Sequence, residues 1–195
     1  LFTGMILALN AGLQLAQFGQ AELVGSLVSV SMCREMGPFM TGLICAANVG
    51  SSMAAEMGTM KVSEEIDALE VMSIDPVRFL VMPRLLGMTL MCPVLTALTD
   101  FVGILGGGVI GYYRLDVDWV IYSRHAIEIL DLKDIYTGLF KAVVFGVIIA
   151  MVGCAQGLKA EKGALGVGQA TRSTVIISFL MIIILGFFLT SVFYS

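Results

Sequence analysis

Arg34 and Glu35 are the first candidates for binding chemistry, because they place two charges at the edge of a long apolar run. Adjacent residues do not face each other on a helix, so these two side chains are not expected to pair with one another. Charged groups at membrane depth usually face a protein interior or a watery cavity. Two alternatives stay open: a polar lining for an amphipathic substrate, or snorkelling to the outer membrane interface.

Asp100 and Lys141 form a second set of candidates, because both fall inside apolar runs. A lone charge in such a place is costly, so we expect the two to pair within the membrane. We favour a structural role for this pair over a proton relay.

A short acidic segment, residues 63–72, lies between two strongly apolar regions. Ser63 is a good N-cap, and acids in the first turn suit the helix dipole. We expect Asp75-Pro76 to end the helix, because the residue before proline is biased away from helical geometry. One face is apolar: Ile66, Leu69 and Met72. So short a helix has little core of its own, so we predict that it docks in a groove of a partner; a solvated linker is the alternative.

Several motifs of enzymes and metal sites are absent from the sequence. There is no Gly-x-x-x-x-Gly-Lys-Ser/Thr, no Gly-x-Ser-x-Gly and no His-Glu-x-x-His, and His125 is the only histidine. The chain is therefore expected to bind no ATP through a P-loop, to hold no histidine-rich metal site and to carry no catalytic residues. The cysteines form no Cys-x-x-Cys pair and are expected to be buried free thiols: Cys33, Cys45, Cys92 and Cys154.

The composition of the chain indicates that these residues lie in a membrane protein. Hydrophobic residues make up 58% of the 195 residues and charged residues 13%, against about 25% charged in a soluble domain. With a mean hydropathy of +0.95, the chain cannot cover its surface with polar groups, so lipid must surround it. The net charge of −4 favours no nucleic-acid partner.

Five apolar stretches fit the ~20 residues that a spanning helix needs. They lie near residues 1–19, 27–58, 85–111, 135–156 and 174–194. Long continuous runs without period-2 alternation indicate helices rather than a barrel. We therefore predict an all-α integral membrane protein whose second span is too long for one crossing, so that it tilts, protrudes or kinks at Gly37-Pro38.

The loops between these spans carry the remaining charges. Lys and Arg are more frequent in residues 59–84 and 157–172, Lys162 included, than in the loops of the other side, so these two segments are predicted to be cytoplasmic. Residues 112–134 read as an extracytoplasmic segment with a short helix. Residues 157–172 are expected to form a flexible, glycine-rich loop.

Small residues recur at four-residue spacing in three of the predicted spans. The second span has five of them, Gly42, Ala46, Gly50, Ala54 and Gly58. Shorter series are Gly4, Ala8 and Gly12 in the first span and Gly103, Gly107 and Gly111 in the third. Such stripes let helix backbones approach closely. We favour packing within the chain over a subunit interface.

Several of these residues lie in motifs that resemble the signature of the MlaE (YrbE) permease family. The motifs are Arg34-Glu35-Met36-Gly37-Pro38, Ala54-Ala55-Glu56-Met57-Gly58-Thr59-Met60, residues 64–76 and Pro83-Arg84. The resemblance covers essentially the whole chain. It departs at Ser73, where the family usually has glycine, and an N-terminal interfacial helix of the family is expected to be missing before Leu1.

The resemblance implies one permease domain over residues 1–195, in the cell inner membrane, with the plastid inner envelope as the alternative. Such a permease is the transmembrane subunit of an ABC transporter that moves phospholipids between the inner and outer membranes. The implied partners are a second copy of the chain, a cytoplasmic ABC ATPase (MlaF-like), a periplasmic MCE-domain ring (MlaD-like) and, as an optional addition to the ATPase, a small STAS-domain protein (MlaB-like). No cofactor is implied for the chain itself, because ATP is bound by the partner.

Site residues follow from the same resemblance. Residues 63–74 match the family's coupling helix, with these positions expected to contact the ATPase: Glu64, Glu65, Asp67, Leu69, Glu70 and Met72. A lipid cavity is expected at Arg34, Glu35, Leu7 and Leu13. A channel or lipid-binding scaffold without ATP drive is the alternative function, and it would have no need of the 63–74 helix.

Overall fold

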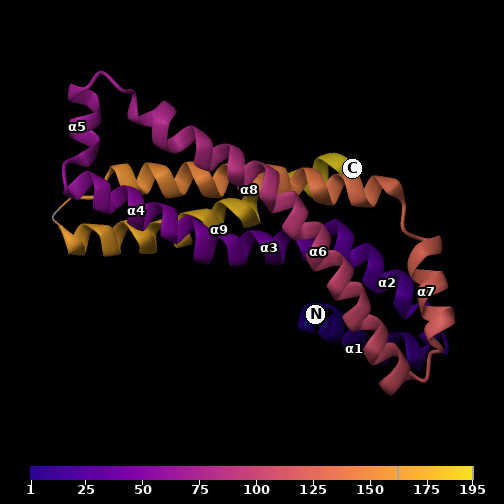
Figure 1. The fold of residues 1–195 in the computed structure, drawn as a ribbon. Helices are drawn as coiled ribbons and strands as arrows, with labels where there is room; N and C mark the ends of the chain where they lie inside the picture. Colours follow the sequence, from indigo (N-terminus) through magenta and orange to yellow (C-terminus); the bar gives the residue numbers. More distant parts are fainter. Residues whose placement is uncertain (162, 195) are drawn as a thin grey trace. The chain divides into compact units, whose positions relative to one another are not determined.

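The computed structural model describes residues 1–161 and 163–194, and every regular element in this part of the chain is a helix (Figure 1). This confirms the all-α class, in which each spanning segment satisfies its backbone hydrogen bonds internally. Lys162, which was counted among the cytoplasmic charges, lies outside the described residues.

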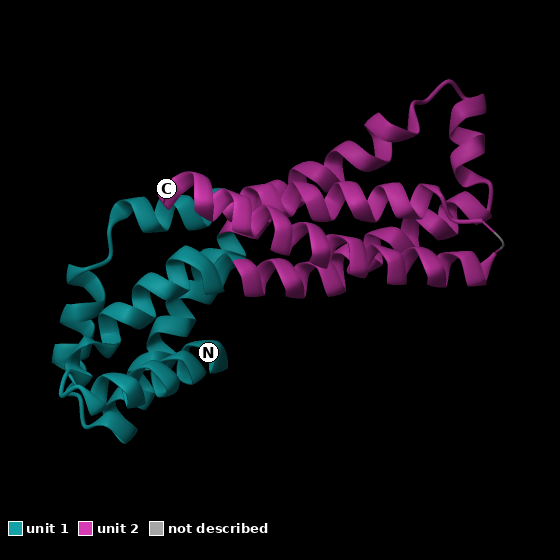
Figure 2. Cartoon of the chain, turned by 180° about the vertical axis from the view of Figure 1, so that it is seen from behind, with its two compact units in different colours: residues 1–38, 94–140 teal, residues 39–93, 141–195 magenta. Residues whose placement is uncertain are grey.

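The chain divides into two compact units (Figure 2). Unit 1 contains Leu1–Pro38 and Val94–Phe140, and unit 2 contains Phe39–Pro93 and the chain from Lys141 onward. Two of the three points where the chain passes between the units coincide with a proline, Pro38 and Pro93. A proline supplies no backbone N–H and weakens the helix around it.

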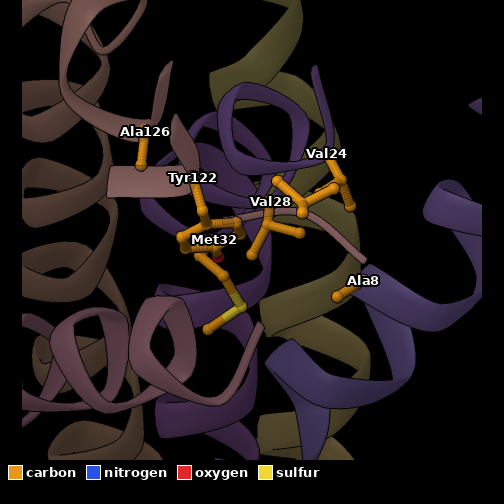
Figure 3. Close-up of a cluster of buried hydrophobic side chains, with 7 residues drawn as sticks. Ala8, Val24, Val28, Met32, Tyr122 and Ala126 are labelled. Atoms are coloured by element: carbon orange, nitrogen blue, oxygen red, sulfur yellow. The ribbon is translucent and has the colours of Figure 1, made fainter. Parts of the chain in front are cut away.

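Unit 1 has a core built around α2 and α7. Its elements are α1 (Phe2–Gln17), η1 (Ala21–Leu23), α2 (Val24–Ser31), the π-helical turn η2 (Met32–Met36), the second part of α6 (Met82–Leu115), α7 (Trp119–Glu128) and the start of α8 (Leu132–Leu158). Val24, Val28 and Met32 of α2 and η2 pack against Tyr122 and Ala126 of α7 (Figure 3). The short helix predicted within residues 112–134 is thus confirmed as α7, with Asp118 as its N-cap.

Glycines of α6 make room for this core. A Cβ at Gly107 would lie 2.6 Å from the Tyr122 hydroxyl oxygen, and one at Gly103 would collide with Met32. The space lets the Tyr122 hydroxyl donate to the backbone carbonyl of Ile104 over 2.9 Å. The glycine series of the third predicted span therefore serves packing within the chain, as expected.

Unit 2 is built from longer helices. Its elements are α3 (Gly37–Cys45), η3 (Ala46–Gly50), α4 (Ser51–Val62), α5 (Glu65–Val71), η4 (Val77–Val81), the first part of α6, most of α8 and α9 (Ala164–Tyr194). One core cluster contains Ala46, Met88, Phe145, Ile149 and Ile182.

The five small residues of the second predicted span all face this interior. A Cβ at Gly42 would lie 3.2 Å from Phe145, one at Gly50 would lie 2.9 Å from Ile149, and one at Gly58 would lie 3.1 Å from Ala160. Ala46 and Ala54 are fully buried. The stripe therefore packs against α8 and α9 of the same chain, which confirms the preferred interpretation.

The second apolar run is not one regular α-helix. Two π-helical turns, η2 and η3, interrupt it between α2 and α4. Turns of this kind are rare in proteins and frequent at functional sites. The first lies directly before Gly37-Pro38, where the sequence predicted a break. Gly138 of α8 approaches this turn so closely that a Cβ there would strike the Cys33 carbonyl oxygen.

The prediction of a flexible, glycine-rich loop over residues 157–172 is wrong. α8 continues to Leu158 and α9 already begins at Ala164. Gly163 takes a φ of +67°, and its carbonyl accepts the N–H groups of Gly166 and Val167. A Cβ at Gly166 would collide with the Glu161 backbone. These glycines therefore permit a tight turn into a helix rather than a long loop.

Three helices of the described chain are long and apolar enough to cross a membrane. They are Val77–Leu115, Leu132–Leu158 and Ala164–Tyr194, with 39, 27 and 31 residues. They correspond to the third, fourth and fifth predicted spans. α1 has 16 residues, fewer than the ~20 of a typical span, so the count of five spans stays a prediction.

Candidate functional site

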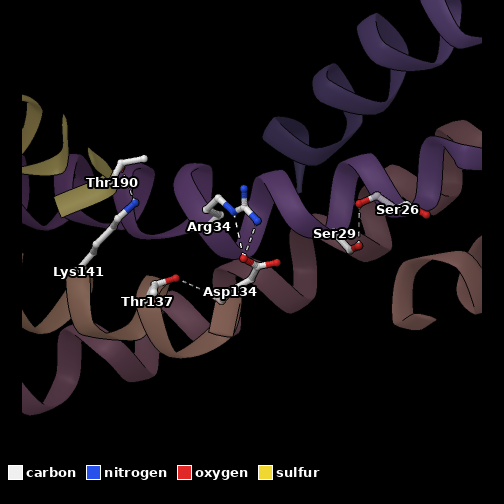
Figure 4. A network of polar contacts seen from close by, with 7 residues as sticks. All are labelled: Ser26, Ser29, Arg34, Asp134, Thr137, Lys141 and Thr190. Atoms are coloured by element: carbon white, nitrogen blue, oxygen red, sulfur yellow. Dashed lines mark hydrogen bonds and ion pairs between the residues drawn. The ribbon is translucent and has the colours of Figure 1, made fainter. Parts of the chain in front are cut away.

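Arg34 lies in η2 and forms an ion pair with the buried carboxylate of Asp134 at the start of α8 (Figure 4). Its Nη2 and Nε atoms lie 2.7 Å and 3.1 Å from Asp134 Oδ1. The Asp134 side chain is 3% exposed and that of Arg34 is 35% exposed. Thr137 donates its hydroxyl to the Asp134 backbone carbonyl over 3.0 Å. The guanidinium is therefore anchored inside unit 1.

Sequence reasoning did not identify Asp134 as the partner of Arg34. Asp134 is the last residue of the segment predicted to be extracytoplasmic, residues 112–134. A signal was available, because Arg34 lies at the outer part of the second predicted span and Asp134 at the outer start of the fourth. Charges at one membrane depth are the natural partners for each other.

The other predicted cavity residues differ in exposure. Glu35 is half-buried in η2. Leu7 is half-buried and packs against the core cluster of unit 1, whereas Leu13 is 53% exposed. Their contact with lipid stays a prediction, and Leu13 is the more accessible of the two leucines.

Lys141 is 1% exposed and donates through Nζ to the Thr190 hydroxyl over 2.8 Å (Figure 4). Thr190 in turn donates to the Gly186 carbonyl over 2.8 Å. Asp100 presents a buried Oδ1 that has no hydrogen-bond partner among the described residues. It faces Gly37, where a Cβ would collide with that oxygen. Asp100 and Lys141 belong to different compact units, and their pairing stays a prediction.

The helix predicted over residues 63–74 is shorter, and both of its predicted ends are wrong. α5 spans Glu65–Val71, and its N-cap is Glu64 with a left-handed φ of 63°. Ser63 instead donates its hydroxyl to the Thr59 carbonyl over 2.9 Å, so it belongs to the end of α4. No side-chain hydrogen bond from the described residues caps α5, because its N-cap position is taken by Glu64 and the Ser63 hydroxyl is directed back to the preceding turn.

The C-terminal end of α5 is set by Ser73 rather than by Asp75-Pro76. Ser73 has a φ of 61°, and its N–H bonds to the Glu70 carbonyl over 2.9 Å. The N–H of Ile74 reaches back to the Leu69 carbonyl over 3.0 Å. A left-handed residue after a helix is usually glycine, which gives a physical reason for the glycine that the resemblance places there.

α5 is rooted in unit 2 by one side chain and exposes most of the others. Ile66 is 2% exposed and packs with Met57 and Cys154. Leu69 is half-buried, and Met72 is 61% exposed. The three residues predicted to share one apolar face therefore have three different environments. Val71, which lies outside that predicted face, is an apolar side chain that is 87% exposed.

Two ion pairs flank α5. Lys61 Nζ lies 2.6 Å from Asp67 Oδ1, and this hydrogen bond raises the pKa of Lys61 above its ordinary value of 10.5. Arg84 Nη2 lies 2.9 Å from Glu56 Oε2, which joins α6 to α4 across 28 residues of chain. The second pair closes the base of the segment that carries α5. Glu56 and Arg84 both lie in the motifs of the resemblance, but the sequence does not show that they pair.

No group of three or more His, Cys, Asp or Glu side chains in the described part of the chain is arranged to hold a metal ion. The four cysteines are buried and free, as expected.

Comparison with known proteins shows which family carries the motifs found around η2 and α5. The family model described as Permease MlaE matches residues 1–192. A protein of Rickettsia prowazekii named a probable ABC transporter permease protein is 39% identical over all of this chain and 75% of its own length. A Synechocystis protein with the same description is 40% identical over 97% of this chain and 72% of its own length.

A third relative has a more specific name. The intermembrane phospholipid transport system permease protein MlaE of Haemophilus influenzae is 34% identical over all of this chain and 75% of its own length. The family match over residues 1–192 includes the motif residues around α5. It also agrees with the helical architecture and its candidate membrane spans. This chain therefore belongs to the MlaE family of permeases.

Proposed function

We propose that this permease is the transmembrane subunit of an ABC transporter that moves phospholipids between the inner and outer membranes. A separate cytoplasmic ATPase would bind and hydrolyse ATP, and the chain itself would use no cofactor. The phospholipid substrate comes from the name of the Haemophilus relative. The assignment to an ABC transporter comes from the names of the Rickettsia and Synechocystis relatives.

α5 is the observation that carries the proposal of an ATPase partner. Val71 at its end and the C-cap residue Met72 are exposed apolar side chains beside exposed carboxylates such as Glu70. Exposed apolar side chains in a polar rim are typical of a protein contact. α5 is anchored in the core by Ile66, and the Glu56–Arg84 pair joins α4 to α6 on either side of it in the chain. A force applied to α5 would thus reach α4 and α6.

The test of this contact is co-purification of the permease with a candidate ABC ATPase expressed together with it. The variant combines Glu70→Lys with Val71→Asp, because both side chains are exposed and neither supports the core. We expect the ATPase to be lost from the purified complex while the permease keeps its thermal stability. Glu22→Lys, an exposed glutamate of unit 1, is the matched control.

Undiminished recovery of the ATPase with the double variant would contradict the coupling role of α5. If in addition lipid moved without ATP in reconstituted vesicles, a channel or scaffold would be the better description.

A second copy of the chain is the proposed partner within the membrane. One subunit has few helices with which to enclose a two-tailed lipid, and closed homo-oligomers are most often two-fold. We place the first and last spans at the two-fold axis, because residues 1–21 and 173–195 carry no Lys, Arg, Asp or Glu. Arg34, Glu35, Leu7 and Leu13 are proposed to face the shared cavity. An MCE-domain ring and a STAS-domain protein are the further partners proposed.

Cysteine crosslinking in a cysteine-free background tests this arrangement. Exposed positions on α9 are Ile176, Leu180, Ile183 and Phe187. Single cysteines there should give disulfide-linked dimers. Leu98 and Phe101 of α6 are equally exposed and should give none. Dimers from α6 and not from α9 would reverse the arrangement, and no dimers from either helix would count against a shared cavity.

A further inference from the structure

α6 and α7 enclose an apolar groove in unit 1 that none of the roles above uses. Its volume is about 240 Å³, and it is lined chiefly by Phe101, Ile104 and Leu105 of α6 and by Trp119, Tyr122 and Ile127 of α7. A dry cavity of ~150 Å³ already admits a benzene ring. The groove therefore has room for a longer alkyl segment.

The hydroxyl groups in the wall are committed to the protein itself. Tyr122 donates to the Ile104 carbonyl over 2.9 Å, and Ser123 donates to the Val120 carbonyl over 3.1 Å. A ligand in the groove would meet alkyl and aromatic surface rather than these donors. The wall is thus suited to a hydrocarbon chain and poorly suited to a polar molecule.

The mouth of the groove faces the surroundings of a membrane helix. α6 belongs to the candidate span Val77–Leu115. The rim residues Phe101 and Ile127 are 63% and 75% exposed. Trp119 is 42% exposed at the first position of α7, and Trp is typical of the level where lipid headgroups begin. In a bilayer, the open side of the groove would therefore contact lipid acyl chains.

A cation flanks the same face of α7. Arg124 is exposed, follows the groove residue Ser123 and precedes Ile127 by one turn. It makes no ion pair with any residue that the structure describes. Glu128, the acid one turn further on, lies 3.9 Å from His125 instead. A guanidinium in this position is complementary to the phosphate of a lipid whose tail enters the groove.

We propose that this groove holds one acyl chain of a resident bilayer phospholipid, with its phosphate at Arg124. This lipid would not be transported. It would fill the space between α6 and α7 and hold α7 in place. The site needs only that the chain resides in a bilayer, so it stands or fails independently of the proposed phospholipid transport.

The test uses the full-length protein in nanodiscs of phosphatidylethanolamine and phosphatidylglycerol. The probe is a phosphatidylglycerol that carries a diazirine on one acyl chain. After illumination, labelled peptides are identified by mass spectrometry. We expect labelling to concentrate on peptides that contain residues 101–105 and 119–130, above that of the exposed face of α6 around Leu86 and Leu90, which lies outside the groove.

Two variants fill the groove from opposite walls, Ser123→Trp on α7 and Leu105→Trp on α6. Losing contact with only two methylene groups weakens binding about tenfold, and we expect labelling to fall by that factor in each. Val120→Trp is the control, because Val120 is 62% exposed on α7 and does not line the groove. Arg124→Gln should lower the labelling by a smaller factor. Added phosphatidylglycerol should raise the melting temperature of the wild type more than that of the filled variants.

Equal labelling of Ser123→Trp, Leu105→Trp and Val120→Trp would overturn the proposal, and so would labelling spread evenly over all exposed apolar faces. Labelling that appears only after partner proteins are stripped away would assign the groove to a partner helix instead. A crosslink between two copies of the chain through residues 119–130 would assign it to self-association.

Discussion

Ion pairs in the two compact units differ in how much water reaches them. In unit 1, Arg34 meets an Asp134 side chain that is 3% exposed. In unit 2, the pairs beside α5 leave Asp67 and Glu56 52% and 59% exposed. Breaking a buried pair is costly, because it strands a charge, whereas an exposed pair contributes little. The buried pair therefore holds η2 in a fixed position, whereas the exposed pairs near α5 can break and re-form at little cost. The proposed coupling to an ATPase would need such freedom at α5.

Removing one partner of the buried pair should have the largest effect. Arg34→Met leaves the Asp134 carboxylate buried without its ion-pair partner, and such losses cost about 3 kcal/mol or more of folding free energy. We expect a large fall in the melting temperature of the purified protein. The double variant Arg34→Met with Asp134→Leu should recover most of the loss, because no stranded charge remains. A double variant as unstable as the sum of the singles would show that the pair does not act as a unit.

Variants of the two charges in the predicted spans, Asp100 and Lys141, should have the next largest effect. Asp100→Asn and Lys141→Met should each lower the folded yield, since a charge without a partner at membrane depth costs ~2.5–3.5 kcal/mol on insertion scales. If the two residues pair, the double variant should recover part of the loss. Thr190→Val is the added control, because it removes the acceptor that Lys141 uses in unit 2. Strictly additive losses for Asp100 and Lys141 would show that they are not partners.

Periodicity and composition were enough to predict the helical class, the α7 helix and the packing of the small-residue stripes. These features depend on side-chain size and polarity along one helix, which a sequence displays directly. The partner of Arg34 was missed because Asp134 is 100 residues away, and only the packing of α8 against η2 brings them together. The loop before α9 was mispredicted because glycine at Gly166 looks flexible, whereas its function is close contact with Glu161.

The ends of α5 were mispredicted for a related reason. Ser63 and Asp75-Pro76 carry the expected capping chemistry, but two residues in left-handed geometry, Glu64 and Ser73, define the turns. Neither residue type announces a positive φ. Only the usual glycine of the family at Ser73 pointed to it.

Ser73 provides a test of the α5 end with a smaller and opposite effect. Its φ of 61° costs a residue with a side chain about 1 kcal/mol relative to glycine. Ser73→Gly should therefore stabilise the turn and slow hydrogen exchange at the N–H groups of Ser73 and Ile74. Ser63→Gly is the matched control, because Ser63 has a φ of −83° and gains nothing from glycine. Faster exchange in Ser73→Gly than in the wild type would contradict the role of this residue as a strained helix end.

The exposed Lys61–Asp67 pair should have the smallest effect, and pH can isolate it. Hydrogen bonding to Asp67 raises the pKa of Lys61 above 10.5, so folding favours the protonated amine. This contribution is fully present below the unfolded pKa and disappears as pH rises through the higher folded pKa. Around neutral pH, Lys61→Met should therefore loosen α5 only slightly.

In the alkaline range, wild-type α5 should become more sensitive to limited proteolysis as Lys61 loses its proton. Lys61→Met should lack that step, because it has no amine to titrate. Parallel alkaline curves for the two proteins would mean that the pair adds nothing to the position of α5. The helix would then be held by Ile66 and the Glu56–Arg84 pair alone, and the contrast between the units would rest on burial rather than on charge.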